Sequence, residues 1–363
     1  MNKLHYAAPL VCGLLWGSAV LAQPSGARGE DFIYKVRAGD TLLDISNTYT
    51  RANRNWSEIQ RLNAVADPAR LPIGKELHIP FRLIPEVDAP ARIVHQAGQV
   101  QVNGQVLSRG ATHLKEGDLV RTGADGYLTL ELQDGSQVSI PAAASLNVSR
   151  MRAFEGTGLI DSVMALDSGD VESRVAPEST GVGRFEVRTP VSITGVRGTE
   201  LRVRTHGGQA HSEVLEGRAE LGTQQQAVPT TLKQNQGAAV AQDGRIVAVA
   251  PLLPAPQVSP PQRQGGRWGS TIEPVPGAQA YLVQTALDPR GAMLLSRTTT
   301  SDTAIQYGAP RPGTYYVMVR AIDSHGLMGP DSIQSFEGAA ALTSSNGEPI
   351  VSGFGDPILL SQF

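Results

Sequence analysis

Residues 32–46 read FIYKVRAGDTLLDIS, and residues 71–80 read LPIGKELHIP. The first stretch opens with apolar side chains at every second position, which is the period of a strand with one buried face. A Gly-Asp-Thr turn then interrupts the alternation. Asp40 or Thr41 can cap a helix there, because either side-chain oxygen can accept an orphan backbone N–H. The second stretch alternates again before its final proline, so the two stretches predict the first and last strands of one small module.

Two short helices are predicted between these strands. Leu42 and Ile45 recur at helical spacing in the first, and Trp56 and Ile59 do so in the second, which has a polar stop at Asn63. The order strand, helix, helix, strand within about fifty residues predicts a compact module with a small core.

This module resembles the lysin motif (LysM) family. The residues that carry the resemblance are Tyr-x-Val-x-x-Gly-Asp-Thr-Leu-x-x-Ile, then Trp-x-x-Ile, an Asn, and Leu-x-x-Gly-x-x-Leu-x-Ile-Pro. The resemblance implies binding of glycans that contain N-acetylglucosamine, such as peptidoglycan and chitin, in a shallow groove between two loops. One wall would be formed by Gly39, Asp40, Thr41 and Leu42, and the other by Leu71, Pro72 and Ile73. The Gly-Asp-Thr turn can also be read as a turn and helix cap alone, and both readings can hold together.

The composition of the chain bounds its class. Its 363 residues suffice for two or three domains, and its 39 glycines, 24 prolines and 18% charged residues favour many strands and turns. The net charge of −3 argues against a nucleic-acid partner, since phosphate binding depends on an excess of basic groups.

Residues 1–22 read as a signal peptide, with Lys3 before an apolar run and small residues before a cleavage point. Cys12, the single cysteine, lies inside this segment, so the mature chain is expected to have no disulfide. No later stretch is long and apolar enough to span a membrane. The sequence therefore predicts an exported protein of a bacterial periplasm.

The remainder of the chain is predicted to be β structure. Short alternating stretches recur between Asn-Gly and Asp-Gly turns, which favours a sandwich, barrel or solenoid over helical folds. The expected segments are 31–80 for the LysM module, 81–91 for a linker, 92–249 for an all-β domain, 250–267 for a Pro-rich linker, 268–337 for a β-sandwich and 338–363 for an unassigned tail.

The all-β segment 92–249 resembles the FecR-type domain through residues 185–203, which read FEVRTPVSITGVRGTELRV. The hallmark is Phe-x-Val-x-Thr-Pro followed by Val-Arg-Gly-Thr. The resemblance implies a periplasmic location, and the founding members relay an outer-membrane signal to a sigma factor. No transmembrane helix precedes the domain here, so signal relay is an alternative function. Arg197 can bind a partner or serve only as part of a glycine-flanked corner, and the second reading is favoured.

The β-sandwich segment 268–337 is similar to a fibronectin type III domain. Trp268 opens it, and a late strand begins at Tyr315 after a Pro-Gly-Thr turn. We expect the hydroxyl of Tyr315 to bond backbone a few residues upstream, as in a tyrosine corner.

No catalytic set emerges from the sequence. His206 and His211 with Glu213 supply too few ligands for a metal, and Asp161 and Asp167 show no sign of a shared cleft. We therefore predict no catalytic residue, no metal site and no cofactor. A further set alternates with apolar residues and is expected mainly to face solvent, with an acidic partner as the other reading: Arg184, Glu186, Arg188, Arg202 and Arg204.

Together these features predict a multidomain, mainly β protein that is not an enzyme. The LysM module would hold peptidoglycan, and the FecR-type and sandwich domains would meet an envelope protein partner. The alternatives are an envelope signal-relay component and a cell-wall hydrolase or its accessory.

Overall fold

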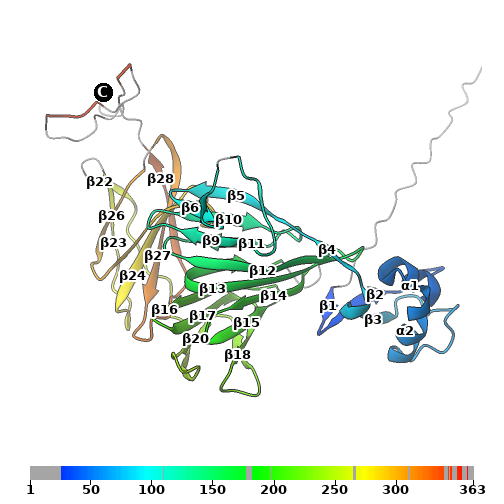
Figure 1. Ribbon diagram of the computed structural model, residues 1–363. Helices are drawn as coiled ribbons and strands as arrows, with labels where there is room; N and C mark the ends of the chain where they lie inside the picture. The colour runs from blue at the N-terminus through cyan, green and yellow to red at the C-terminus, as the bar shows by residue number, and fades with distance from the viewer. Residues whose placement is uncertain are drawn as a thin grey trace, which may run out of the picture.

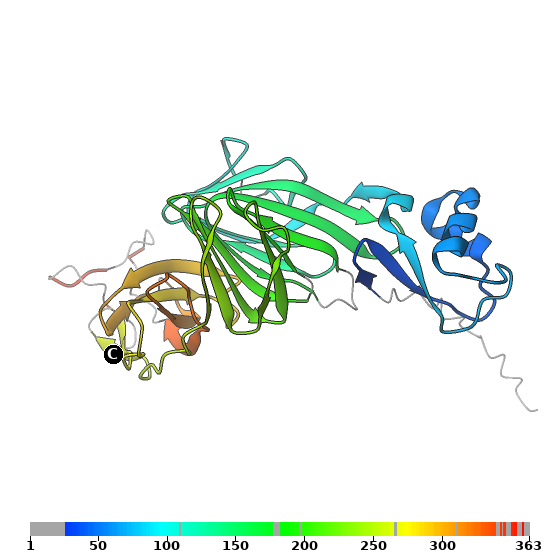
Figure 2. The same cartoon turned by 90° about the horizontal axis from the view of Figure 1, so that it is seen from below.

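The computed structural model describes residues 26–108, 110–176, 182–196, 198–264, 267–309 and 311–338, with scattered positions between 342 and 358. Three parts follow one another along the molecule: a small module with the helices, a large β domain and a C-terminal sandwich (Figures 1 and 2). The predicted fold class, mainly β with a small helical module, is confirmed. The predicted signal peptide (residues 1–22), Arg197 and most of the tail lie outside the described residues.

The N-terminal module has the predicted order of strand, two helices and strand. Phe32, Leu42, Ile59 and Leu77 are at most 1% exposed and form the centre of its core. Its elements are β1 (Ala27–Arg28), β2 (Asp31–Lys35), α1 (Leu42–Thr50), the 3-10 turn η1 (Asn53–Asn55), α2 (Trp56–Leu62) and β3 (Glu76–Pro80), with the strands in the order β1-β2-β3.

The middle domain consists of two sheets that enclose one apolar core. The outer sheet has the order β7 (Gln105–Val106), β6 (Val100–Val102), β9 (Leu119–Thr122), β12 (Ser145–Phe154), β13 (Leu159–Arg174), β14 (Val182–Arg188), β15 (Ser192–Val196), β18 (Arg218–Thr223) and β19 (Thr230–Lys233), and β4 (Glu86–Asp88) pairs with the end of β12.

The inner sheet faces the C-terminal sandwich. Its order is β8 (His113–Leu114), β5 (Ala91–Ala97), β10 (Tyr127–Glu131), β11 (Gln137–Ile140), β13, β16 (Glu200–His206), β17 (Gln209–Glu216), β20 (Gln236–Val240) and β21 (Ile246–Pro251). The predicted Asn-Gly turn lies between β6 and β7, with positive φ at Asn103 and Gly104, which is the geometry that such hairpins require.

Strand β13 belongs to both sheets. It pairs with β12 and β14 in the outer sheet as far as Ser168, and with β11 and β16 in the inner sheet from Gly169 onward. Gly169 has a φ of +88°, and a Cβ there would lie 2.6 Å from the Cα of Ala144. The crossing therefore needs a residue without a side chain, both for its backbone angle and for the close approach of the neighbouring chain.

The C-terminal part is a two-sheet sandwich. Tyr315 lies in its core, and its hydroxyl accepts a hydrogen bond of 3.2 Å from the backbone N–H of Arg311, as expected for the predicted corner. One sheet is β22 (Gln262–Gln264), β23 (Arg267–Thr271) and β26 (Ala304–Tyr307), and the other is β25 (Leu294–Thr300), β24 (Ala280–Ala286), β27 (Gly313–Ile322) and β28 (Ser332–Gly338).

The junction between the N-terminal module and the middle domain, which we call the first junction, is mainly apolar. The rings of Phe81 and Phe154 stack at 4.1 Å between centroids. Phe154 and Leu159, at the tip of the β12–β13 hairpin, are part of the core of the small module. Residues 81–91, predicted as an extended connector, contain the 3-10 turn η2 (Phe81–Leu83) and β4, and β4 pairs with β12.

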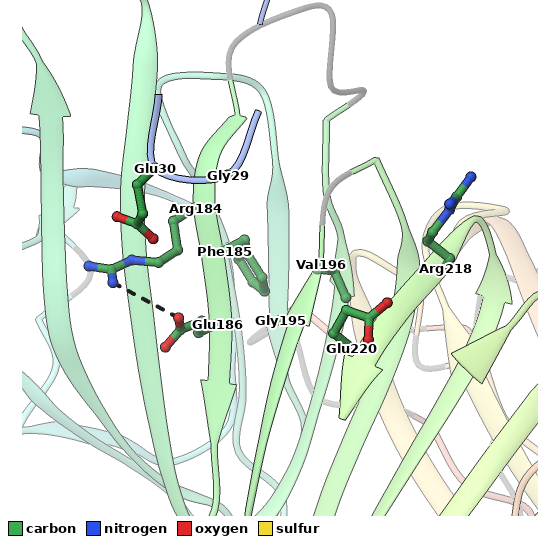
Figure 3. Close-up of a pocket in the computed structure, with 9 residues that line it drawn as sticks. All are labelled: Gly29, Glu30, Arg184, Phe185, Glu186, Gly195, Val196, Arg218 and Glu220. Carbon is green, nitrogen blue, oxygen red and sulfur yellow. Dashed lines mark ion pairs between the residues drawn. The ribbon is translucent and has the colours of Figure 1, made fainter. Parts of the chain in front are cut away.

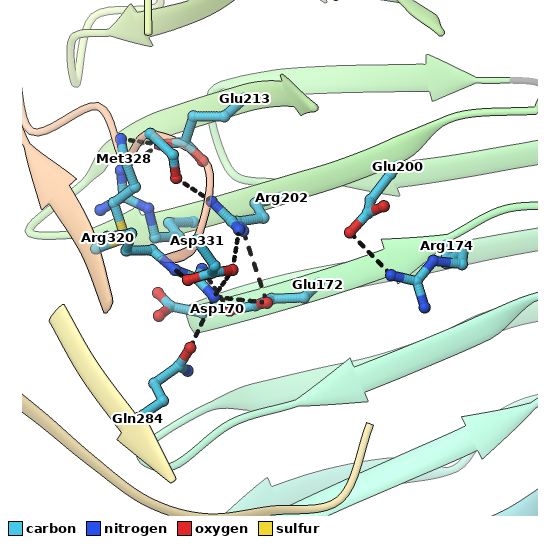
Figure 4. Close-up of polar contacts among 12 residues, drawn as sticks. Asp170, Glu172, Arg174, Glu200, Arg202, Glu213, Gln284, Arg320, Met328 and Asp331 are labelled. Atoms are coloured by element: carbon cyan, nitrogen blue, oxygen red, sulfur yellow. Dashed lines mark hydrogen bonds and ion pairs between the residues drawn. The ribbon is translucent and has the colours of Figure 1, made fainter. Parts of the chain in front are cut away.

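The second junction, between the inner sheet and the sandwich, combines a buried ionic cluster (Figure 4) with a small apolar cluster, in which Tyr127 and Ala97 pack with Ala286, Leu294 and Met318. Arg320 of β27 donates to Glu172 of β13 at 2.9 Å, and Arg202 of β16 donates to Asp331 at 2.8 Å. A further ion pair across it joins Arg297 to Asp170. The four-stranded sheet of the sandwich is therefore covered by the middle domain.

We predict that Gly169→Ala lowers the midpoint of urea unfolding strongly, at a cost of about 2–5 kcal/mol from the left-handed backbone and the overlap with Ala144. Gly135→Ala is the matched control, because Gly135 also has positive φ but a Cβ there would meet nothing within 4 Å. Its expected cost is about 1–2 kcal/mol. Equal shifts for the two variants would contradict the role given to the crossing.

Candidate functional site

The two loops predicted to form the groove lie side by side in the N-terminal module. The backbone N–H of Leu42 donates to the carbonyl of Pro68 at 2.9 Å, and that of Gly74 donates to the carbonyl of Val36 at 2.8 Å. These bonds hold the loop after β2 against the segment before β3. Both loops therefore meet at the end of the module where α1 begins.

Asp40 and Thr41 have different structural roles in the first loop. The carboxylate of Asp40 accepts hydrogen bonds of 2.7 Å from the hydroxyl of Tyr34 and from the backbone N–H of Arg37, so it holds the loop closed. Thr41 is the N-cap of α1, and its hydroxyl oxygen accepts from the N–H of Asp44 at 3.1 Å. Burial, followed by the bond to Asp40, raises the pKa of Tyr34. Tyr34 therefore stays a neutral donor.

The seven predicted groove residues divide by exposure. Leu42 and Leu71 are buried and support the walls from beneath. Gly39, Pro72 and Ile73 are exposed, and Ile73 is 73% exposed although it is a large apolar residue. A Cβ at Gly39 would meet nothing within 4 Å, so the backbone there is open to an approaching ligand. The surface that these two loops leave open therefore consists of backbone and the side chains of Pro72 and Ile73.

A separate surface pocket of about 450 Å3 lies between the β1–β2 turn and the outer sheet (Figure 3). Glu30 and Arg184 lie on one side of Gly195, and Glu220 lies on the other. Arg184 donates to Asp161 at 2.7 and 2.8 Å. Asp161, an acid considered above for catalysis, is 2% exposed and also pairs with Arg150. Two arginines thus neutralise this carboxylate, and it is part of the sheet's structure.

The prediction that Arg202 and Arg204 face solvent is wrong. Arg202 is 3% exposed, and both side chains lie under the sandwich. The alternation along β16 correctly indicates a polar face, but the covering layer comes from residues more than a hundred positions later. Burial alone would raise the pKa of Glu172, yet Arg320 and Arg202 hold it at about 2. The cluster is a structural joint between domains.

The histidines considered for a metal site have other surroundings. His206 lies at the β16–β17 turn, and His211 Nε2 is 2.9 Å from the carbonyl oxygen of His325. Glu213 accepts from Arg204 and from the N–H of Met328. Within the described ranges, no group of three or more His, Cys, Asp or Glu side chains could hold a metal ion.

Comparison with known families locates two domains. Residues 34–80 match the LysM domain, and residues 118–220 match the family described as FecR protein. The chain therefore carries a LysM domain followed by a FecR-type domain, which are binding and regulatory domains and not catalytic ones. Members of both occur in envelope or periplasmic proteins. No curated protein matches the chain.

Solved structures resemble the chain only distantly. A "putative anti-sigma factor" from Parabacteroides distasonis has 17% identity and a TM-score of 0.30, and the match covers 37% of this chain and 59% of that one. The FN1–FN3 domains of chicken CNTN1 have 12% identity and a TM-score of 0.22, with 67% and 98% covered. The glycoside hydrolase domain of Endo-D from Streptococcus pneumoniae R6 has 11% identity and a TM-score of 0.20, with 58% and 33% covered.

Sequence reasoning missed the residues that join the domains. Phe154 and Asp331 have no distinctive motif around them, and their partners across the junctions, Phe81 and Arg202, lie far away in sequence. The local signals of a binding surface in the sequence were the Gly-Asp-Thr turn and the Leu-Pro-Ile segment. Among the described residues, no helix combines the length and apolar composition that a membrane span requires.

We predict that acid weakens the second junction through His211. Burial, and then the charge of Arg204, lower the pKa of His211, although Glu213 and Asp323 oppose this. The folded state therefore favours the neutral ring, and stability is lost as pH falls below the unfolded value of about 6.5. The thermal unfolding midpoint should fall between pH 7.5 and 5.5, and His211→Gln should flatten that slope. His113→Gln, at an exposed position on β8, is the control; an unchanged slope in His211→Gln would contradict the assignment.

Proposed function

We propose that this protein is a non-enzymatic, periplasmic peptidoglycan-binding protein whose LysM groove attaches two β domains to the cell wall. The observation that carries the proposal is the meeting of the two groove loops, with open backbone at Gly39 and the exposed side chain of Ile73 beside it. The LysM match over residues 34–80 supports the same ligand class.

The groove suits a neutral amide-bearing sugar. Backbone N–H and C=O groups at an open loop can pair with an acetamido group, and an exposed isoleucine can cover the apolar face of a sugar ring. One shallow site of this kind binds in the range of about mM to μM, or roughly −4 to −8 kcal/mol. A dense glycan array offsets that weakness through its high local concentration.

We assign the C-terminal sandwich to the fibronectin type III type, and its strand order supports the assignment. Its sheets of three and four strands have the orders β22-β23-β26 and β25-β24-β27-β28, and Tyr315 closes a corner at the start of β27. We assign it, with the FecR-type domain, the role of meeting a protein partner in the envelope. The signal peptide predicted at residues 1–22 supports export to the periplasm.

The FecR match favours a second candidate function, an envelope signal-relay component. The two candidates are compatible in location but differ in the partner that they need. A relay requires a membrane-linked or sigma-factor-linked partner, whereas attachment requires the wall and is compatible with any envelope protein as the partner of the β domains. A hydrolase role lacks any observation in its favour among the described side chains, and a zymogram on purified wall tests it by the clearing that a hydrolase would produce.

We predict that Ile73→Ala reduces co-sedimentation of the purified protein with peptidoglycan sacculi about 5- to 30-fold, since about 1–2 kcal/mol of apolar contact with the sugar is lost. Ile73 is so exposed that its removal should leave folding unchanged. Leu62→Ala is the matched control, because Leu62 is a 45% exposed apolar side chain of the same module outside both loops. Equal sedimentation of Ile73→Ala and the native protein would count against the groove.

For the relay candidate, crosslinking in cells is the discriminating measurement. We expect a crosslinker placed at the exposed Gln306 of the sandwich to recover an envelope protein, whose identity separates the two functions. Recovery of a membrane-spanning regulator that is lost on signal induction would favour relay. Recovery of wall fragments alone would favour attachment.

A further inference from the structure

We infer that the three domains form one rigid spacer, with the LysM groove at one end and the C-terminal sandwich at the other. The proposed function assigns what the groove binds; this inference adds that binding sets both the direction and the distance of the sandwich. It rests on contacts at the two junctions and on the strand that connects them.

The groove is connected to the first junction by helix α1. Thr41, at its N-terminus, belongs to the groove wall, whereas Tyr49 and Arg51, at its C-terminal end, reach the middle domain. A nine-residue helix extends about 14 Å. Arg51 pairs with Glu155, and a Cβ at Gly156 would lie 3.9 Å from the ring of Tyr49. The groove therefore faces away from the rest of the molecule.

At the first junction, the segment that links the small module to the middle domain is itself hydrogen-bonded to the middle domain. The only covalent link runs through residues 81–91, and β4 within it pairs with β12, with Glu86 opposite Phe154. The backbone N–H of Glu155 also donates to Pro85 at 2.9 Å. Because the stacked Phe81 and Phe154 complete the core of the module, rotation about this junction would expose apolar surface. Such a cost is absent from a module on a flexible tether.

Strand β13 connects the first junction to the second across the middle domain. Leu159, its first residue, is buried in the core of the small module, and Glu172, near its end, pairs with the sandwich. Its sixteen residues correspond to roughly 50 Å of extended chain. The strand is hydrogen-bonded on both sides in each sheet, so its two ends move together.

The second junction fixes orientation through directional bonds. Domains in one chain usually move relative to each other unless the interface is extensive. Here Arg320 is 1% exposed and contacts Glu172, Asp331 and Gln284, while Arg202 donates to Asp331 and to the carbonyl of Gly329. Displacing the sandwich would leave these buried charges without partners. The free energy that this costs is far greater than the cost of sliding one apolar surface over another.

The test measures distances in the full mature chain without glycan, so its failure is independent of failed glycan binding. That chain has no cysteine once residues 1–22 are removed, so spin labels can be placed at will. One pair, Ser57→Cys with Ser149→Cys, spans the first junction, and Ser149→Cys with Asp302→Cys spans the second. All three positions are exposed. Pulsed electron paramagnetic resonance should give a single narrow distance distribution for each pair.

Substitutions at each junction test whether the contacts described above cause the rigidity. Phe154→Ala should broaden the first distribution at least twofold and leave the second unchanged, and Phe154→Leu should restore it in large part. Asp331→Asn, which keeps the side-chain shape, should broaden only the second. Val106→Ala, at an exposed position on β7, is the control and should change neither. A broad distribution in the native chain overturns the inference, as does an unchanged first distribution in Phe154→Ala.

Discussion

The passage of β13 from the outer sheet to the inner sheet is the constraint on which the rest of the structure depends. One strand pairs with four neighbours, closes the core of the N-terminal module with its first residue and supplies acids to the ionic joint near its last. A strand that changes sheets has to bend, and here the bend lies at Gly169, where a positive φ and the close approach of Ala144 exclude a side chain. The contacts of the middle domain with the N-terminal module and with the sandwich are thus made by the two ends of the same strand.

The two junctions both fix neighbouring domains, but they differ in the interactions that do so. The first buries aromatic surface, and burial of this kind is favourable in itself, at about 25 cal/mol per Å2. The second buries four arginines against four acids: Asp170, Glu172, Arg202, Arg204, Glu213, Arg297, Arg320 and Asp331. Desolvation offsets most of the attraction in such a cluster, so its net contribution to stability is small. Breaking one pair is nevertheless costly, so the ionic cluster specifies orientation more than it adds stability. The apolar cluster around Tyr127 supplies favourable burial at the same junction.

Local patterns predicted the elements well, while contacts between distant segments could not be predicted. The alternation and the Gly-Asp-Thr turn located both strands and both helices of the small module, and the Asn-Gly turn at 103–104 located a hairpin. The groove loops were placed together because a family motif fixed their pairing. Arg202 shows the limit: a polar face under a second domain has the same period-two pattern as one facing water. Only the register of β16 with β13 and the docking of β27 distinguish them.

Rigidity changes what a weak groove can accomplish. A site of mM to μM strength on a flexible chain would leave the β domains free to sample many positions, and a second partner would have to offset that lost freedom on binding. When the domains are fixed, the ordering cost between them has already been met during folding. On the proposed function, attachment to the wall would raise the effective concentration of the sandwich only at the distance set by β13, and a partner elsewhere would gain nothing. Fixed geometry is therefore a source of selectivity that needs no additional contact with either ligand.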